Sequence, residues 1–142
     1  MSRWDQEAEK IMIEHFGKDT IIALSTVDND MPFVRYVNAY YENGAFYIIT
    51  YALSNKMKHI EKNPTVAIAG DWFTAHGKGV NLGYFGKKEN VEIADKLKKA
   101  FAEWIILHIK RWEPESCYSE LKTGLMQEKP FSILFGAGCA RF

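Results

Sequence analysis

The chain has 142 residues, of which 47% are apolar and 25% are charged, values typical of one globular domain with a single core. Its 18 basic residues balance its 18 acidic residues, so nucleic acid is not an expected partner, because duplex binding needs a basic excess on one face. The two cysteines do not form a disulfide framework pattern, and neither a signal peptide nor a membrane-spanning apolar run is visible. We therefore expect one cytoplasmic domain, residues 1–142, that binds no membrane.

The first half of the chain alternates a helical pattern with strand patterns. Apolar residues recur at helical spacing in Trp4–Phe16, which predicts a helix. The β-branched and apolar runs Thr20–Val27 and Phe33–Tyr41 predict two strands. Asn43-Gly44 suits a type I′ turn, which predicts a hairpin between the second strand and Ala45–Tyr51.

The second half continues with a short helix from about Ser54 to Glu61. Thr65–Phe73 and Gly79–Phe85 are the next predicted strands, and an apolar stripe predicts a long helix from about Lys88 to Lys110. Phe131–Phe135 could close the sheet as a sixth strand. Short strands joined by hairpins, with helices at their sides, predict an antiparallel α+β fold or a small barrel with helical additions.

Histidine and cysteine do not mark a reactive centre. His15 and His108 fall on the apolar stripes of their helices, where we expect packed side chains, and we expect His59 to be solvated. Neither Cys117 nor Cys139 belongs to a local signature with a histidine. The chain also lacks metal-ligand spacings such as CxxC or HExxH, so we expect no metal site.

The glycine-rich stretch His76–Gly83 admits two interpretations. It follows a predicted strand and precedes a helix, as a dinucleotide-binding fingerprint would. Its third glycine comes one residue late, however, and the preceding hairpin is antiparallel, whereas that fold needs parallel neighbours. The other interpretation is a flexible turn between two strands.

The stretch around the short helix also has two interpretations. Thr50, Ser54 and Lys56 bring two hydroxyls and an ammonium to the start of a helix, where backbone N–H groups and the helix dipole favour an anion. Arg35 can lie near Thr50, because the hairpin places their strands side by side. In the alternative, Ser54 is an ordinary helix cap and Lys56 an ordinary solvated residue. The local motif favours neither.

A longer pattern runs through the same region. "STVD" is followed by P-x-V-R-x-V, then by a glycine-turn hairpin, T-x-x-x-S-x-K and N-P-x-V-A. In this order, the motifs of residues 20–85 resemble the pyridoxamine 5′-phosphate oxidase-like family of FMN-binding split β-barrels. The resemblance implies a six-stranded antiparallel split barrel that forms a homodimer, with FMN sites at the dimer interface.

The resemblance also implies which residues bind FMN. They are Arg35, Val37, Asn38, Thr50, Ser54, Asn55 and Lys56. Arg35, Ser54 and Lys56 match the positions that hold the FMN phosphate. Asn55 stands where the true oxidases have an arginine.

The remaining matched positions concern the flavin ring. Val37 and Asn38 match the strand segment whose backbone borders the isoalloxazine, and Thr50 matches a threonine that contacts the flavin.

The function implied by the resemblance is that of an FMN-dependent oxidoreductase. Electrons would pass from a reduced nicotinamide donor through FMN to a small-molecule acceptor. The alternative is a non-catalytic module that binds or senses flavin or haem on the same scaffold. The C-terminal segment 112–142 diverges from the family and lacks the basic and aromatic segment with which true pyridoxamine phosphate oxidases bind substrate, so vitamin B6 oxidase activity is not expected.

Overall fold

The computed structural model describes residues 3–51, 53–71, 73–84, 86–103 and 123–135. Within them, the helices are α1 (Arg3–Phe16), α2 (Asn55–Lys62) and α3 (Val91–Ala100), and a 3₁₀ turn at Lys88–Asn90 precedes α3. The strands are β1 (Thr20–Asp28), β2 (Met31–Glu42), β3 (Ala45–Tyr51), β4 (Thr65–Gly70), β5 (Phe73–Tyr84) and β6 (Thr123–Phe135). Among the described helices, none is long and apolar enough to cross a membrane.

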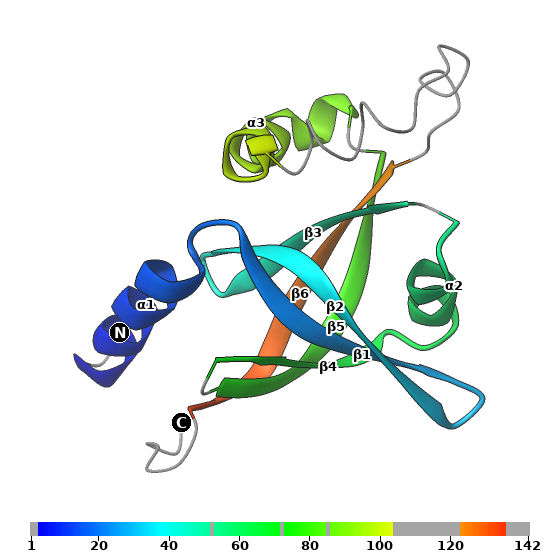
Figure 1. Cartoon of the computed structure of the whole chain (residues 1–142), viewed down its shortest axis with the longest axis horizontal. Coiled ribbons are helices and arrows are strands. Elements are labelled where there is room, and N and C mark those ends of the chain that lie inside the picture. Colours follow the sequence, from blue (N-terminus) through cyan, green and yellow to red (C-terminus); the bar gives the residue numbers. More distant parts are fainter. Residues whose placement is uncertain (1–2, 52, 72, 85, 104–122, 136–142) are drawn as a thin grey trace.

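The strands form an antiparallel barrel. Their order is β1-β2-β3-β6-β5-β4, and β4 pairs with β1 to close the sheet. Figure 1 shows α1 and α2 on opposite sides of this barrel, with α3 beyond β3. The expected α+β class, an antiparallel sheet with helices beside it, is confirmed.

The hairpin between β2 and β3 turns where the sequence predicts it. Asn43 and Gly44 both have positive φ, at 49° and 77°, as the central residues of a type I′ turn require. Glu42 and Ala45 pair directly across the turn. Tyr41 secures the hairpin further, because its hydroxyl accepts a hydrogen bond from the Gly44 N–H and donates one to Glu9 of α1.

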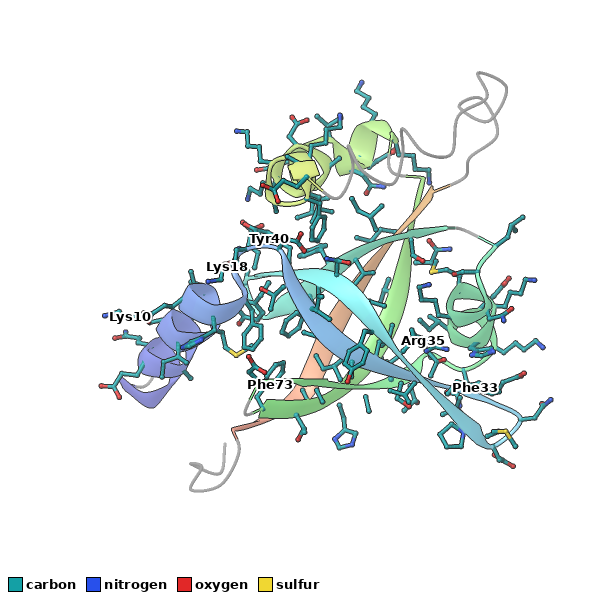
Figure 2. All side chains as sticks on the ribbon, in the orientation of Figure 1. Lys10, Lys18, Phe33, Arg35, Tyr40 and Phe73 are labelled. Carbon is teal, nitrogen blue, oxygen red and sulfur yellow. The ribbon has the colours of Figure 1, made fainter. Side chains whose placement is uncertain are left out.

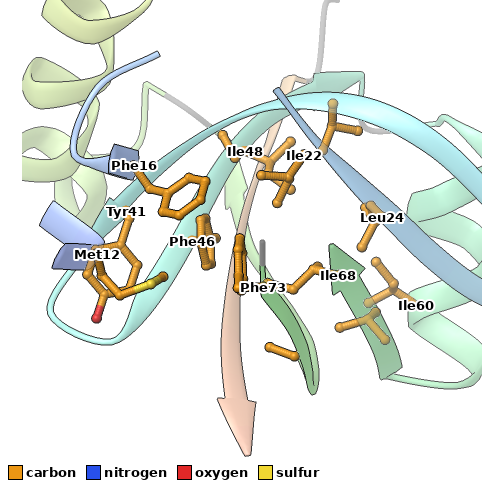
Figure 3. Close-up of a cluster of buried hydrophobic side chains, with 14 of the residues drawn as sticks. Met12, Phe16, Ile22, Leu24, Tyr41, Phe46, Ile48, Ile60, Ile68 and Phe73 are labelled. Atoms are coloured by element: carbon orange, nitrogen blue, oxygen red, sulfur yellow. The ribbon is translucent and has the colours of Figure 1, made fainter. Parts of the chain in front are cut away.

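The barrel interior is filled by alternate strand residues and by aromatic rings. On β1, every second residue from Ile22 to Thr26 is buried. The rings of Phe46 and Phe73 stack with centroids 5.7 Å apart, and Phe16 of α1 meets Phe73 edge-on at 4.7 Å. Figure 3 shows these rings at one end of the core and Leu24 with aliphatic neighbours at the other.

The glycine-rich stretch His76–Gly83 is not a turn. It lies within β5, which begins at Phe73 and pairs antiparallel with both β4 and β6. Gly70 of β4 pairs directly with Phe73 of β5, so the two strands connect before this stretch begins. Both interpretations made from the sequence, a flexible turn and a dinucleotide fingerprint, are therefore wrong, because the glycines are strand residues of an antiparallel sheet.

Gly79 of β5 lies where helix α2 packs closely against the strand. A Cβ atom built at Gly79 would lie 3.0 Å from two carbon atoms of Ile60, so the absent side chain lets α2 pack directly on β5.

The helix predicted for Lys88–Lys110 is interrupted at Phe101, and Ala102 and Glu103 beyond it are again helical. The α-helix begins at Val91 and ends at Ala100, where Phe101 leaves helical geometry with φ −102° and ψ 22°. The apolar stripe could not reveal this interruption, because Phe101 stays on the stripe and is buried with Leu97. Residues 104–110 of the prediction, which include His108, lie outside the described residues.

Candidate functional site

The end of the barrel beside α2 collects the polar residues of interest. Met57, His59 and Ile60 of α2 are buried, and the helix packs against β1 and β5. Figure 2 shows Arg35 and Phe33 of β2 extending toward this helix. The structure thus brings residues from three separate segments, β1, β2 and α2, to one place.

Arg35 reaches this place because of the alternation along β2. It shares one face of the strand with Val37 and Ala39, which are buried, and it pairs with Leu24 of β1. The guanidinium is partly buried, and its Nη1 donates to the Leu24 carbonyl at 3.3 Å and to Thr26 Oγ1 at 2.7 Å. Strand β1 therefore holds the arginine from one side.

Lys56 is the second residue of α2 and lies close enough to Arg35 to interact with it. Burial lowers the pKa of the Lys56 ammonium below its ordinary value of 10.5, and the positive charge of Arg35 lowers it further. The first turn of α2 carries no acidic residue, although the positive end of a helix dipole favours one. A nearby anion would relieve the repulsion between Lys56 and Arg35, and it would interact favourably with the positive end of the helix dipole.

Ser54 occupies the N-cap position of α2, but its side chain does not cap the helix. Its carbonyl accepts the N–H groups of Met57 and Lys58, each at 3.1 Å, whereas its hydroxyl makes no capping bond. The Ser54 Oγ is buried and has no hydrogen-bond partner within the described part of the chain. A buried hydroxyl without a partner costs about 1–3 kcal/mol, a cost that a bound water, ion or ligand would remove by hydrogen bonding to it.

Arg35, Ser54 and Lys56 therefore form one arrangement, called here the basic site. It combines a guanidinium, an ammonium and a buried hydroxyl at the start of a helix. These donor groups suit the oxygens of a phosphate, because arginine can bind two oxygens at once and lysine adds a mobile charge. The interpretation of Ser54 as an ordinary helix cap is wrong for its side chain.

Thr50 does not pair with Arg35 in the β-sheet. The ladder between β2 and β3 joins Tyr40–Glu42 to Ala45–Tyr47. Farther along, Arg35 pairs with Leu24 of β1, and the buried Thr50 pairs with Gly124 of β6. The hairpin makes β2 and β3 neighbours, as the sequence predicts, but the two strands pair with different partners near the site.

The other predicted residues have varied environments. The Val37 side chain belongs to the barrel core and faces Ile22 across the ladder. Asn38 donates from Nδ2 to the carboxylate of Asp19 at 2.8 Å. Asn55, the first residue of α2, is exposed.

Sequence reasoning missed Thr26 and Asp28 in this region, and its prediction that His59 is solvated was wrong. His59 is not solvated: it is 8% exposed, and its Nδ1 lies 2.8 Å from Thr26 Oγ1. Thr26 is fully buried, and Asp28 Oδ2 lies 3.9 Å from His59 Nε2. The alternation of Ile22–Thr26 gave a signal for the buried threonine, whereas no local signal pointed to its contact with His59. The prediction for His15 was also wrong, since that side chain is exposed on α1.

Comparison with known proteins extends this description. The family model of pyridoxamine 5′-phosphate oxidase matches residues 9–128. A comparison with curated proteins gave no significant match.

Solved structures share the fold at low sequence identity. The haem storage protein HutZ from Vibrio cholerae is 16% identical, with a TM-score of 0.65 over 95% of this chain and 98% of that one. General Stress Protein 26 from Bacillus anthracis is 19% identical, with a TM-score of 0.59 over 96% and 98%. An FAD-binding protein from Mesorhizobium loti is 13% identical, with a TM-score of 0.59 over 94% and 92%. At these identities the likeness shows the fold alone.

Proposed function

The chain belongs to the pyridoxamine 5′-phosphate oxidase family, and from this premise we propose that it binds FMN through the phosphate at the basic site. The observation that carries the proposal is the buried hydroxyl of Ser54, which has no hydrogen-bond partner among the described residues and lies two positions before Lys56, the lysine that interacts with Arg35. A phosphate dianion would accept a hydrogen bond from Ser54 and balance the two positive charges. On this proposal, the barrel is a split barrel of the FMN-binding type.

An oxidoreductase role follows from the proposed FMN binding. When bound, the flavin itself supplies the hydride and electron chemistry, so the protein need only bind and orient it. Arg35, Ser54 and Lys56 would hold the phosphate, while the backbone of Val37–Asn38 and Thr50 would border the ring. Electrons would come from a reduced nicotinamide donor and go to a small-molecule acceptor.

We also propose that the protein is a homodimer with FMN at the interface. Three large apolar side chains on the outer face of the β1–β2 ladder support this: Tyr36 is 80% exposed, Val34 71% and Ile21 61%. A contiguous exposed apolar surface of this kind commonly marks an interface. The net charge of zero adds little repulsion between two copies.

The alternative function is a module that stores or senses flavin or haem without catalysis. The fold likeness to a haem storage protein is the observation that favours it. Visible absorbance of the purified protein separates these ligands, because a flavin gives paired bands in the near-ultraviolet and blue, whereas a haem gives an intense Soret band. Turnover with a reduced nicotinamide then separates the enzyme from the non-catalytic module.

The decisive experiment compares FMN with riboflavin, which lacks the phosphate. We expect Arg35→Ala combined with Lys56→Ala to weaken FMN binding by roughly 100-fold or more, because charged hydrogen bonds contribute about 1.5–3 kcal/mol each. Riboflavin affinity should change less than about threefold, since it makes no phosphate contact. Fluorescence titration measures both dissociation constants.

The matched control is Lys58→Ala, which removes an exposed lysine from the same helix. It should leave both affinities unchanged. A wild-type protein that takes up no FMN, or equal losses for FMN and riboflavin in the double variant, would contradict the proposal.

A further inference from the structure

A chain of polar side chains continues from Arg35 into the protein. Arg35 Nη1 donates to Thr26 Oγ1 at 2.7 Å, and Thr26 Oγ1 lies 2.8 Å from His59 Nδ1. His59 Nε2 lies 3.9 Å from Asp28 Oδ2. Thr26 is fully buried and His59 nearly so, and neither belongs to the residues expected to contact FMN.

The chemistry of these groups fixes the direction of hydrogen bonding. A guanidinium has no acceptor atom, so Thr26 must accept from Arg35. The single hydroxyl proton of Thr26 then needs an acceptor, and an unprotonated His59 Nδ1 at 2.8 Å provides one. If Nδ1 carried a proton instead, Thr26 would accept twice and its buried hydroxyl proton would lose this acceptor. The favoured state is therefore a neutral imidazole with its proton on Nε2, the nitrogen that faces Asp28.

This arrangement has a consequence for Arg35. The Thr26 hydroxyl accepts from Arg35 and donates to His59, so its proton is directed away from the guanidinium and a residue of α2 orients an acceptor on β1. The same helix carries Ser54 at its N-cap and Lys56 in its first turn. Packing of α2 therefore brings together the ligands of the basic site and the support for its arginine.

We propose that Thr26 and His59 are positioning residues that hold Arg35 ready for a phosphate, and that they thereby set the preference of the site for phosphorylated over unphosphorylated flavin. The inference rests on the proposed FMN binding. Holding the flexible arginine in place before the ligand arrives reduces the entropy lost on binding. The preference for phosphate then depends on two buried residues that do not touch the ligand.

The test uses a pair of substitutions at one position. Thr26→Val keeps the shape of the side chain and removes the hydroxyl, whereas Thr26→Ser keeps the hydroxyl. We expect Thr26→Val to weaken FMN binding by roughly 10-fold, the equivalent of one hydrogen bond, with riboflavin binding within about twofold of wild type. Thr26→Ser should retain the wild-type ratio of the two affinities. A merely structural role would change stability without changing this ratio.

A second pair tests His59. Asparagine can place an acceptor oxygen near the position of Nδ1, so His59→Asn should preserve the FMN-to-riboflavin ratio, whereas His59→Phe should lower it as Thr26→Val does. A third measurement needs no variant: ¹⁵N spectra of the wild-type protein at mildly alkaline pH should show His59 protonated on Nε2. A proton on Nδ1 would overturn the inference.

The outcomes separate this inference from the proposed function. If the wild-type protein binds no FMN, both are overturned. If Arg35→Ala lowers the FMN-to-riboflavin ratio but Thr26→Val and His59→Phe do not, FMN binding through the basic site stands and the positioning role is overturned.

Discussion

Ser54 is the residue whose structure differs most clearly from what the sequence pattern predicts. Serine at the N-cap ordinarily accepts a hydrogen bond from the first turn and stabilises the helix. Here the carbonyl takes part in the helix while the buried hydroxyl has no partner among the described residues. The position therefore carries a cost that a bound phosphate would offset.

The substitution Ser54→Ala distinguishes a cap from a ligand-binding residue. A capping serine would lose about 1 kcal/mol of stability on replacement by alanine. We expect no loss, because the buried hydroxyl makes no hydrogen bond to any described residue, and a gain of up to about 1 kcal/mol in the free energy of unfolding without FMN. The affinity for FMN should fall by roughly 10-fold.

Urea denaturation of the ligand-free protein and FMN titration are the two measurements. Ser54→Thr, which keeps a hydroxyl, is the matched control and should bind FMN better than Ser54→Ala. A stability loss in Ser54→Ala with unchanged FMN affinity would restore the capping interpretation.

Arg35 and Lys56 also have an unfavourable interaction that a bound phosphate would offset, in this case between two positive charges. Burial of the Lys56 ammonium lowers its pKa, and repulsion from the Arg35 guanidinium lowers it further. The sequence could propose these residues because Lys56 follows Ser54 by two positions and Arg35 interrupts an apolar strand. Their proximity is a property of the folded barrel.

At the scale of elements, α2 is the part that assembles the site. It covers one end of the barrel, provides Ser54 and Lys56 at its start, and inserts His59 beside Thr26. Its closeness to β5 depends on Gly79, since a Cβ there would lie within 3.1 Å of three Ile60 carbons.

The substitution Gly79→Ala tests whether the position of α2 on β5 controls FMN binding at the basic site. Overpacking of this kind costs about 1–3 kcal/mol, so we expect the free energy of unfolding to fall by that amount. FMN affinity should fall as well, because a displaced α2 moves Ser54 and Lys56 away from Arg35. Ile60→Val removes one of the crowded carbons, so the double variant should be more stable than the sum of the two single effects predicts.

Gly44→Ala is the control for this prediction. Its positive φ of 77° makes alanine strained, while nothing lies within 4 Å of the added carbon. It should therefore lower stability and leave FMN affinity unchanged. Equal loss of FMN affinity in both variants would mean that general destabilisation, rather than the position of α2, weakens binding.

At the scale of the whole molecule, the outer face of the β1–β2 ladder is the surface that a second copy would cover. Val34 and Tyr36 extend from it on the opposite face of β2 from Arg35. Strand β2, which carries Arg35 as a proposed phosphate-binding residue, would thus also form the interface. This agrees with the proposal of a cofactor site shared between two protomers.

Charging this surface should separate the proposed dimer. We expect Val34→Asp to shift the sedimentation coefficient to that of a monomer, because a carboxylate at the centre of an apolar interface loses its hydration. FMN affinity should fall with dissociation. Val91→Asp, at a valine that is 52% exposed on α3, is the matched control and should change neither property. A wild-type protein that sediments as a monomer would contradict the dimer.

The local elements of this protein follow from the sequence by itself. Period-2 and helical patterns predicted strands at Thr20–Val27 and Phe33–Tyr41 and the helix at Trp4–Phe16, because these patterns depend only on neighbouring residues. The Asn43-Gly44 turn was equally local, since two positive φ angles need residues that tolerate them.

Only the tertiary structure decided how these elements meet. Thr26 and His59 are separated by 33 positions, and their hydrogen bond exists because α2 packs across β1 once the barrel has formed. Gly79 likewise gains its role from Ile60, a residue of another element. Periodicity indicates which face of an element is apolar, but not which buried polar group will face it. The basic site could therefore be proposed from the sequence, whereas the two buried residues that support its arginine could be found only in the fold.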